Sequence, residues 1–178
     1  TPVWKPAPHL PAVPPLPVSG RFLYDVGLLL DRQDMVKLGV ERDVLADSVR
    51  PIVEAGLADL VEMDHRITDE VWLEPTPGHT PGHVSVHVAS KGREAVITGD
   101  LMHHPIQCSE PDLANNFDSD REAARQTRRA FLARYSDRPV LVLGTHFAPP
   151  TGGWVVRAGQ AWQFSVGPEP GASGGQLG

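Results

Sequence analysis

Apolar residues in the second half of the chain follow the patterns of β-strands. Over residues 84–88, three valines alternate with Ser85 and His87, which gives one apolar and one polar face. A period of two is typical of a half-buried strand, so we expect His87 to face water. Val71 and Leu73 show the same spacing and predict a short preceding strand.

Two further runs lack this alternation. Residues 95–98 and 140–143 are almost wholly apolar, and unbroken runs of this length are typical of central strands. Residues 154–164 supply one or two closing strands. Together these segments predict one sheet of the α/β class with helices on one side.

Two helices are predicted beside the strands. Residues 119–122 form a capping box, in which a serine is followed three positions later by a glutamate. The helix that follows should bury a stripe made of Ala124, Thr127, Phe131 and Tyr135, while its arginines form a solvated face. A shorter helix is predicted from residue 45 to Gly56, a good terminator, with Pro51 near its first turn.

The two ends of the chain have a different character. Residues 1–20 are so rich in proline that an extended, polyproline-like arm is expected. Such an arm is either disordered or, because it carries apolar residues such as Trp4 and Leu10, packed on a surface of its own subunit or of a second one. Residues 165–178 are rich in glycine, proline and serine, and we expect a disordered tail.

Composition narrows the functional classes. The formal net charge of −6 and the pI near 5.7 argue against a nucleic-acid partner, because phosphate binding needs a basic face. The single cysteine, Cys108, cannot form an internal disulfide, which fits a reducing compartment. No run approaches the length of a membrane span and no leader opens the chain. We therefore expect a soluble, cytoplasmic protein without a membrane partner.

Three short motifs place potential metal ligands after strand-like runs. They are Gly-His-Thr-Pro-Gly-His at 78–83, Thr-Gly-Asp at 98–100 and Gly-Thr-His at 144–146. The ligands would be His79, Asp100 and His146, two imidazoles and one carboxylate that suit zinc and similar divalent ions. Because these residues lie far apart in the sequence, only the fold can bring them together.

The order of these motifs resembles the second half of the metallo-β-lactamase-fold hydrolases, in particular the lactonase and organophosphate-hydrolase-like branch. Residues 47–51 and 99–105 add to the resemblance, which covers residues 46–164 and leaves 21–45 poorly matched. It implies that His79 is a ligand of a first metal, that Asp100 bridges two metals and that His146 is a ligand of a second. It also implies small-molecule substrates.

The leading His-x-His-x-Asp-His motif of that family does not occur in the sequence, and His65 follows an aspartate without the preceding histidines. We therefore expect one ion per chain, zinc or another divalent metal such as manganese. The fold class is expected to be a truncated metallo-β-lactamase-like sandwich, a mixed sheet with helices outside. In the family two such halves pack sheet on sheet, so a homodimer, or residues 1–45 in cis, should cover the open sheet face.

The predicted function is hydrolysis of ester, lactone or phosphotriester bonds through a metal-bound water, with Asp100 orienting that water or accepting its proton. We expect His83, His103 and His104 to be supporting residues, one of which could complete the coordination. Two alternatives stay open. One is a non-catalytic dimeric remnant of a metallohydrolase, and the other is a metal-free hydrolase that uses Cys108 with His104 as a nucleophilic pair.

Overall fold

The computed structural model describes residues 22–23, 50–59 and 61–171 of the 178-residue chain. The proline-rich arm and nearly all of segment 21–45 lie outside these residues, as does the end of the tail. The elements are β1 (Phe22–Leu23), α3 (Arg50–Glu54), β2 (Ala58–Asp59), β3 (Val71–Pro75), β4 (Val84–Ser90), β5 (Arg93–Ile97), η2 (Gly99–Leu101), α4 (Ile106–Ser109), α5 (Arg121–Tyr135), β6 (Val140–Leu143), β7 (Gly152–Ala158) and β8 (Ala161–Ser165).

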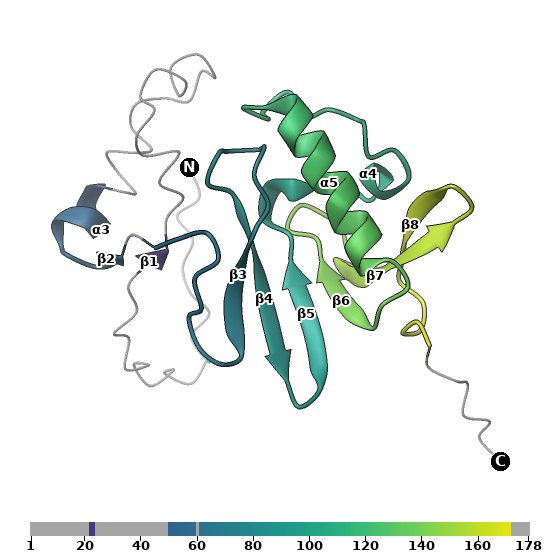
Figure 1. The fold of residues 1–178 in the computed structure, drawn as a ribbon, viewed down its shortest axis with the longest axis horizontal. Coiled ribbons are helices and arrows are strands. Elements are labelled where there is room, and N and C mark those ends of the chain that lie inside the picture. The colour runs from purple at the N-terminus through teal and green to yellow at the C-terminus, as the bar shows by residue number, and fades with distance from the viewer. Residues whose placement is uncertain (1–21, 24–49, 60, 172–178) are drawn as a thin grey trace, which may run out of the picture.

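The described strands form a mixed sheet in the order β3-β4-β5-β6-β7-β8, and β1 pairs with β2 in a separate, small parallel pair. Neighbours in the large sheet run antiparallel, except that β5 and β6 are parallel. A parallel pair needs a crossover connection, and here η2, α4 and α5 provide it, with α5 lying across one face of the sheet (Figure 1). The predicted mixed sheet of the α/β class is confirmed.

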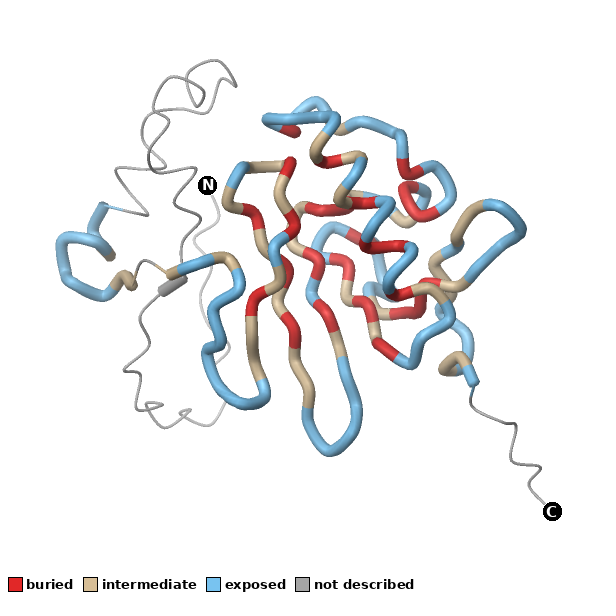
Figure 2. Tube along the Cα trace, in the orientation of Figure 1, coloured by how far each residue is buried: buried red, intermediate tan, exposed pale blue. Residues whose placement is uncertain are grey.

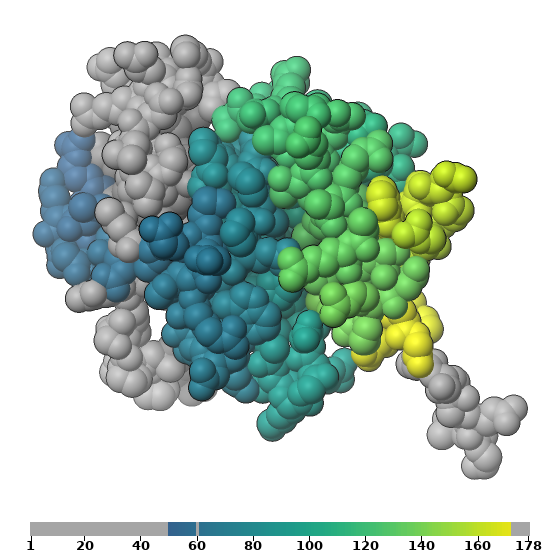
Figure 3. All heavy atoms as spheres, in the orientation of Figure 1, coloured from purple at the N-terminus to yellow at the C-terminus, as the bar shows by residue number. Residues whose placement is uncertain are grey.

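The core lies between α5 and the sheet face beneath it. Val96, Val142 and Val155 project from three strands towards Phe131 and Leu132 of α5, and all five are at most 3% exposed. Figure 2 shows buried segments, in red, along both α5 and the strands beneath it, and Figure 3 shows the atoms of α5 lying over part of this face of the sheet. Removal of this apolar area from water is the main stabilising contribution to the domain.

The polar face of β4 is buried, so the expectation that His87 faces water is wrong. His87 is 3% exposed and lies beneath α5, where its Nε2 contacts the Glu74 carboxylate and the Tyr135 hydroxyl, the latter at 2.8 Å. The Tyr135 hydroxyl also donates to Glu74 at 2.6 Å. Ser85, fully buried on the same face, donates to the carbonyl oxygen of Thr98. Hydrogen bonds of this kind offset the cost of burying the polar groups.

Helix α5 differs from its prediction in two details. Its N-cap is Asp120, one residue later than the capping box suggests, and the Asp120 side chain accepts from the amide of Ala123 at 2.9 Å. Arg128 is not part of a solvated face, since it is 1% exposed. Its guanidinium donates to the carbonyl oxygens of Leu101 and Pro111 at 3.1 and 2.8 Å, which supports the crossover connection from inside.

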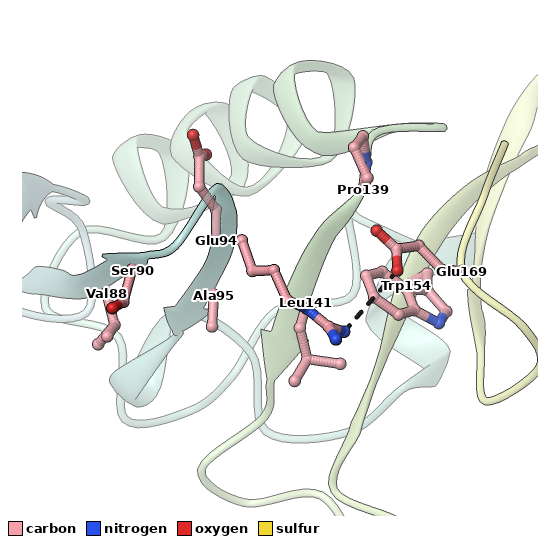
Figure 4. Close-up of a pocket in the computed structure, with 9 residues that line it drawn as sticks. Val88, Ser90, Glu94, Ala95, Pro139, Leu141, Trp154 and Glu169 are labelled. Carbon is pink, nitrogen blue, oxygen red and sulfur yellow. Dashed lines mark ion pairs between the residues drawn. The ribbon is translucent and has the colours of Figure 1, made fainter. Parts of the chain in front are cut away.

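The other face of the sheet is apolar and only partly buried. The strand register places Val88, Ala95 and Leu141 side by side on this face. Together with Trp154 they line an open hollow of about 310 Å³, whose rim carries an ion pair of 3.8 Å between Arg93 and Glu169 (Figure 4). This hollow lies towards the start of β5, whereas Asp100 follows the end of β5.

Ordered contacts continue beyond residue 165, where the tail was expected to begin. Ser165 belongs to β8, and the Trp154 indole donates to the carbonyl oxygen of Gly167 at 3.1 Å. Residues 172–178 lie outside the described part of the chain. Among the described residues, no helix is long and apolar enough to cross a membrane.

Candidate metal centre

Three loops meet at one edge of the sheet. Loop 76–83 connects β3 to β4, while the Thr-Gly-Asp and Gly-Thr-His motifs follow β5 and β6. Because β5 and β6 are parallel, and because Val86 of β4 pairs with Ile97 of β5, these loops leave the strands at the same edge. The topology therefore brings together the three motifs that the sequence keeps apart.

Glycines allow the loops to approach one another. Gly78 has φ +134°, and a Cβ there would lie 2.2 Å from the backbone nitrogen of Ala124, so this loop passes directly against the first turn of α5. Gly99 has φ +56°, and a Cβ there would lie 2.8 Å from Nε2 of His83. A side chain at either position would push the loop away from its neighbour.

His83 joins the first loop to the second. Its Nε2 accepts from the backbone amide of Asp100 at 2.9 Å, so the ring proton is on Nδ1, which donates to the carbonyl oxygen of Thr76 at 2.9 Å. The ring is only 9% exposed. His83 therefore fixes the backbone of Asp100, and both ring nitrogens are already engaged.

Asp100 is the centre of the cluster. One carboxylate oxygen lies 3.1 Å from Nε2 of His79, and the other lies 2.6 Å from Nε2 of His146. The structure thus brings together the three residues that the sequence singles out. His79 is largely buried, while His146 and Asp100 are more open to solvent, with side chains 45% and 39% exposed.

His103 joins them as a fourth member. One donor atom each from His79, Asp100 and His103 lies within 4.8 Å of the other two. The ring of His103 also stacks on that of His146, with centroids 4.6 Å apart and planes inclined by 9°. His103 comes three residues after Asp100, directly beyond the single turn of η2, and this short spacing was the available sequence signal.

The charges of the cluster are strongly coupled. The pKa of His79 is raised to about 9, because its ring donates to the carboxylates of Asp100 and Asp118. The hydrogen bond from His79, with a second from His146, holds the pKa of Asp100 well below its usual range. Burial lowers the pKa of His103. Asp100 is therefore an anion among imidazoles at neutral pH.

His79, Asp100 and His103 form a group that fits one divalent ion, and His146 contacts this group through Asp100. Imidazole nitrogens and carboxylate oxygens are borderline to hard ligands that zinc accepts at about 2.0–2.2 Å, so neighbouring ligands around a tetrahedral ion lie roughly 3.4 Å apart. The 3.1 Å between His79 and Asp100 is close to that separation. Solvent exposure on the side of His146 leaves access for a small molecule.

The environment of Cys108 opposes its use as a nucleophile with His104. Cys108 is fully buried, its thiol contacts the Met102 sulfur at 3.9 Å, and burial raises its pKa to about 12. His104 is exposed, and its Nδ1 accepts from the backbone amide of Ile106 at 3.1 Å. The reactive form of cysteine is the thiolate, which this site disfavours.

Comparison with known proteins agrees with this architecture. Residues 69–146 match the family model described as the metallo-beta-lactamase superfamily. A solved structure described as hydrolase AbOPH in the beta lactamase superfamily has a TM-score of 0.64 and 23% identity, covering 77% of this chain and 50% of that chain. AidC, a dizinc quorum-quenching lactonase solved with a product, has a TM-score of 0.57 and 18% identity, covering 70% and 47%. No curated protein matches the sequence.

At these identities the solved structures show the fold. The chain spans about half the length of each of these two structures. The family match contains His79, Asp100, His103 and His146, so the whole cluster lies within the segment that the family model recognises.

Proposed function

We propose, starting from the metallo-β-lactamase fold of residues 69–146, that this chain carries the metal site of a divalent-metal-dependent hydrolase for ester, lactone or phosphotriester bonds. The observation that carries the proposal is the convergence of His79, His103 and His146 on the carboxylate of Asp100. We propose one zinc ion per chain, with manganese as a possible substitute. The solved relatives include a dizinc lactonase, which supports a zinc-dependent site of this kind.

The environment of each residue in the cluster suggests its role in hydrolysis. A divalent ion in such a site supplies Lewis acidity and makes water nucleophilic near neutral pH. Asp100 would be the carboxylate ligand of the ion, and it would orient the bound water or accept its proton. His79 and His103, both partly buried, would form the inner side of the site, and His146, whose side chain is 45% exposed, would border the approach of the substrate.

The proposal predicts a metal-dependent activity. Hydrolysis of a chromogenic ester, a lactone and a phosphotriester should be measured before and after treatment with a chelator. We expect at least one of these activities to fall to background and to return when zinc or manganese is added, since the buried thiol of Cys108 offers no other nucleophile.

Cys108→Ala is the matched variant for that experiment, and its activity should stay close to that of the unaltered chain. Activity that resists the chelator and disappears in Cys108→Ala would contradict the proposal. Stoichiometric zinc binding without hydrolysis of any of the three substrates would instead favour the non-catalytic remnant.

We also propose that two copies of this chain associate through the sheet face opposite α5. Val88, Ala95 and Leu141 form a continuous apolar strip there, and Ile97 beside it is 38% exposed. Contact of the same face with its own copy gives the closed, twofold arrangement that is commonest among homodimers.

The dimer predicts a specific effect of charge on that face. Light scattering should give the mass of two chains, and Val88→Lys should shift it towards the mass of one, because a buried ammonium group in the interface is costly. Ala133→Lys, at an exposed position on α5, is the control and should leave the mass unchanged. A single-chain mass for the unaltered protein would contradict the proposal.

A further inference from the structure

A buried carboxylate lies behind His79, on the side away from Asp100. Oδ1 of Asp118 is 3.2 Å from Nδ1 of His79, and the Asp118 side chain is 1% exposed. Nε2 of the same ring faces Asp100. Neither the family match nor the motifs of the sequence assign a role to Asp118.

We propose that Asp118 is the positioning residue of the site, which orients His79 so that its Nε2 is presented to the metal; this inference rests on the proposed function. An imidazole that donates from one nitrogen to a carboxylate has its tautomer and ring direction fixed, and it becomes a stronger ligand through the other nitrogen. The arrangement of Asp118, His79 and Asp100 is of this type.

Arg128 holds Asp118 in place. Its Nη2 lies 3.7 Å from Oδ2 of Asp118, and this nitrogen has no hydrogen-bond partner among the described residues. Its Nη1 donates to the carbonyl oxygens of Pro111 and Leu113 at 2.8 and 3.2 Å, so the guanidinium is anchored in the crossover connection. A buried carboxylate is costly unless it is paired, and here the pair is completed by a fixed cation and by the His79 ring.

Residues next to Asp118 in the sequence also contact His103. The backbone amide of Asn115 donates to Asp118 at 3.3 Å, and the Asn115 side-chain amide lies 2.9 Å from Nδ1 of His103. Residues 115–118 therefore support the two imidazoles on the buried side of the cluster. A purely structural ion pair between Asp118 and Arg128 would not need the contact with His79.

The test compares zinc affinity, measured by competition with a chromophoric chelator, for the unaltered chain, Asp118→Asn and Asp112→Asn. Asp112 is a matched control, because it is an exposed aspartate that pairs with Arg129 on the outside of α5. We expect Asp118→Asn to bind zinc about 10- to 100-fold more weakly, the usual effect of losing such an outer partner, and Asp112→Asn to be unchanged. Equal affinities for all three would overturn the inference.

A second readout uses the unaltered chain and does not depend on whether Asp118→Asn folds. Nitrogen–proton NMR spectra of the imidazoles should show zinc on Nε2 of His79 and a retained proton on Nδ1. Zinc on Nδ1 would overturn the role of Asp118. If the unaltered chain binds no zinc, the proposed function fails, and the inferred contact is then judged in the metal-free protein by a protected Nδ1 proton on His79, whose absence would overturn it.

Discussion

Replacement of Asp100 by asparagine is expected to weaken zinc binding by more than about 100-fold, beyond the range expected for residues outside the ligand set. The asparagine side chain keeps the shape of aspartate but removes the negative charge that lies between His79 and His146. Three imidazoles without an anion would leave the charge of a divalent ion uncompensated in a half-buried site. Hydrolysis should be lost together with the metal.

Calorimetric titration with zinc measures this effect, and circular dichroism shows whether Asp100→Asn remains folded. Asp112→Asn again serves as the control for a change from aspartate to asparagine at an exposed ion pair. Retention of unaltered zinc affinity by Asp100→Asn would exclude Asp100 from the site.

Zinc affinity should also rise steeply with pH. The raised pKa of His79, about 9, means that this ring carries a proton at neutral pH in the metal-free protein, and zinc must displace it. Because zinc must displace this proton, the apparent zinc affinity should fall by about tenfold for each pH unit below pH 9. His103, whose pKa is lowered, and Asp100, which is already ionised, add no further proton at pH 7.

Chelator competition between pH 7 and pH 9 gives the slope, and titration in buffers of different ionisation enthalpy should show about one proton released per ion at pH 7. The stability of the metal-free protein should change with pH in the opposite direction to the zinc affinity. Because the folded pKa of His79 lies above its ordinary value of 6.5, its contribution to stability is complete below pH 6.5 and is lost as the pH rises through 9. An affinity independent of pH over this range would contradict the ion pair with Asp100.

Much of the sheet could be predicted because strands leave a short-range signal. The runs at 95–98 and 140–143 correspond closely to β5 and β6, and the alternation at 84–88 lies within β4. The side of β4 that is buried could not be predicted. Alternation shows two different faces, but only the partners Glu74 and Tyr135 make the face of His87 the inner one.

Part of the site could be predicted because its ligands follow strands, which leave a short-range signal in the sequence. His79, Asp100 and His146 stand in motifs whose glycines and strand ends indicate their position, and the structure brings the three together. His103 needed the turn of η2 to point it into the cluster, and Asp118 follows no strand. The burial of Arg128 could not be predicted from the sequence either. The carbonyl groups that accept its hydrogen bonds belong to a connecting segment without a periodic pattern.

The most direct test of a metal centre around Asp100 is the metal content of the purified chain, measured by elemental analysis after zinc loading and removal of unbound metal. We predict about one zinc per chain, reduced to near zero in Asp100→Asn and in His79→Ala, whereas Cys108→Ala keeps its zinc. A chain without bound zinc, or zinc that stays bound in both Asp100→Asn and His79→Ala, would contradict the account.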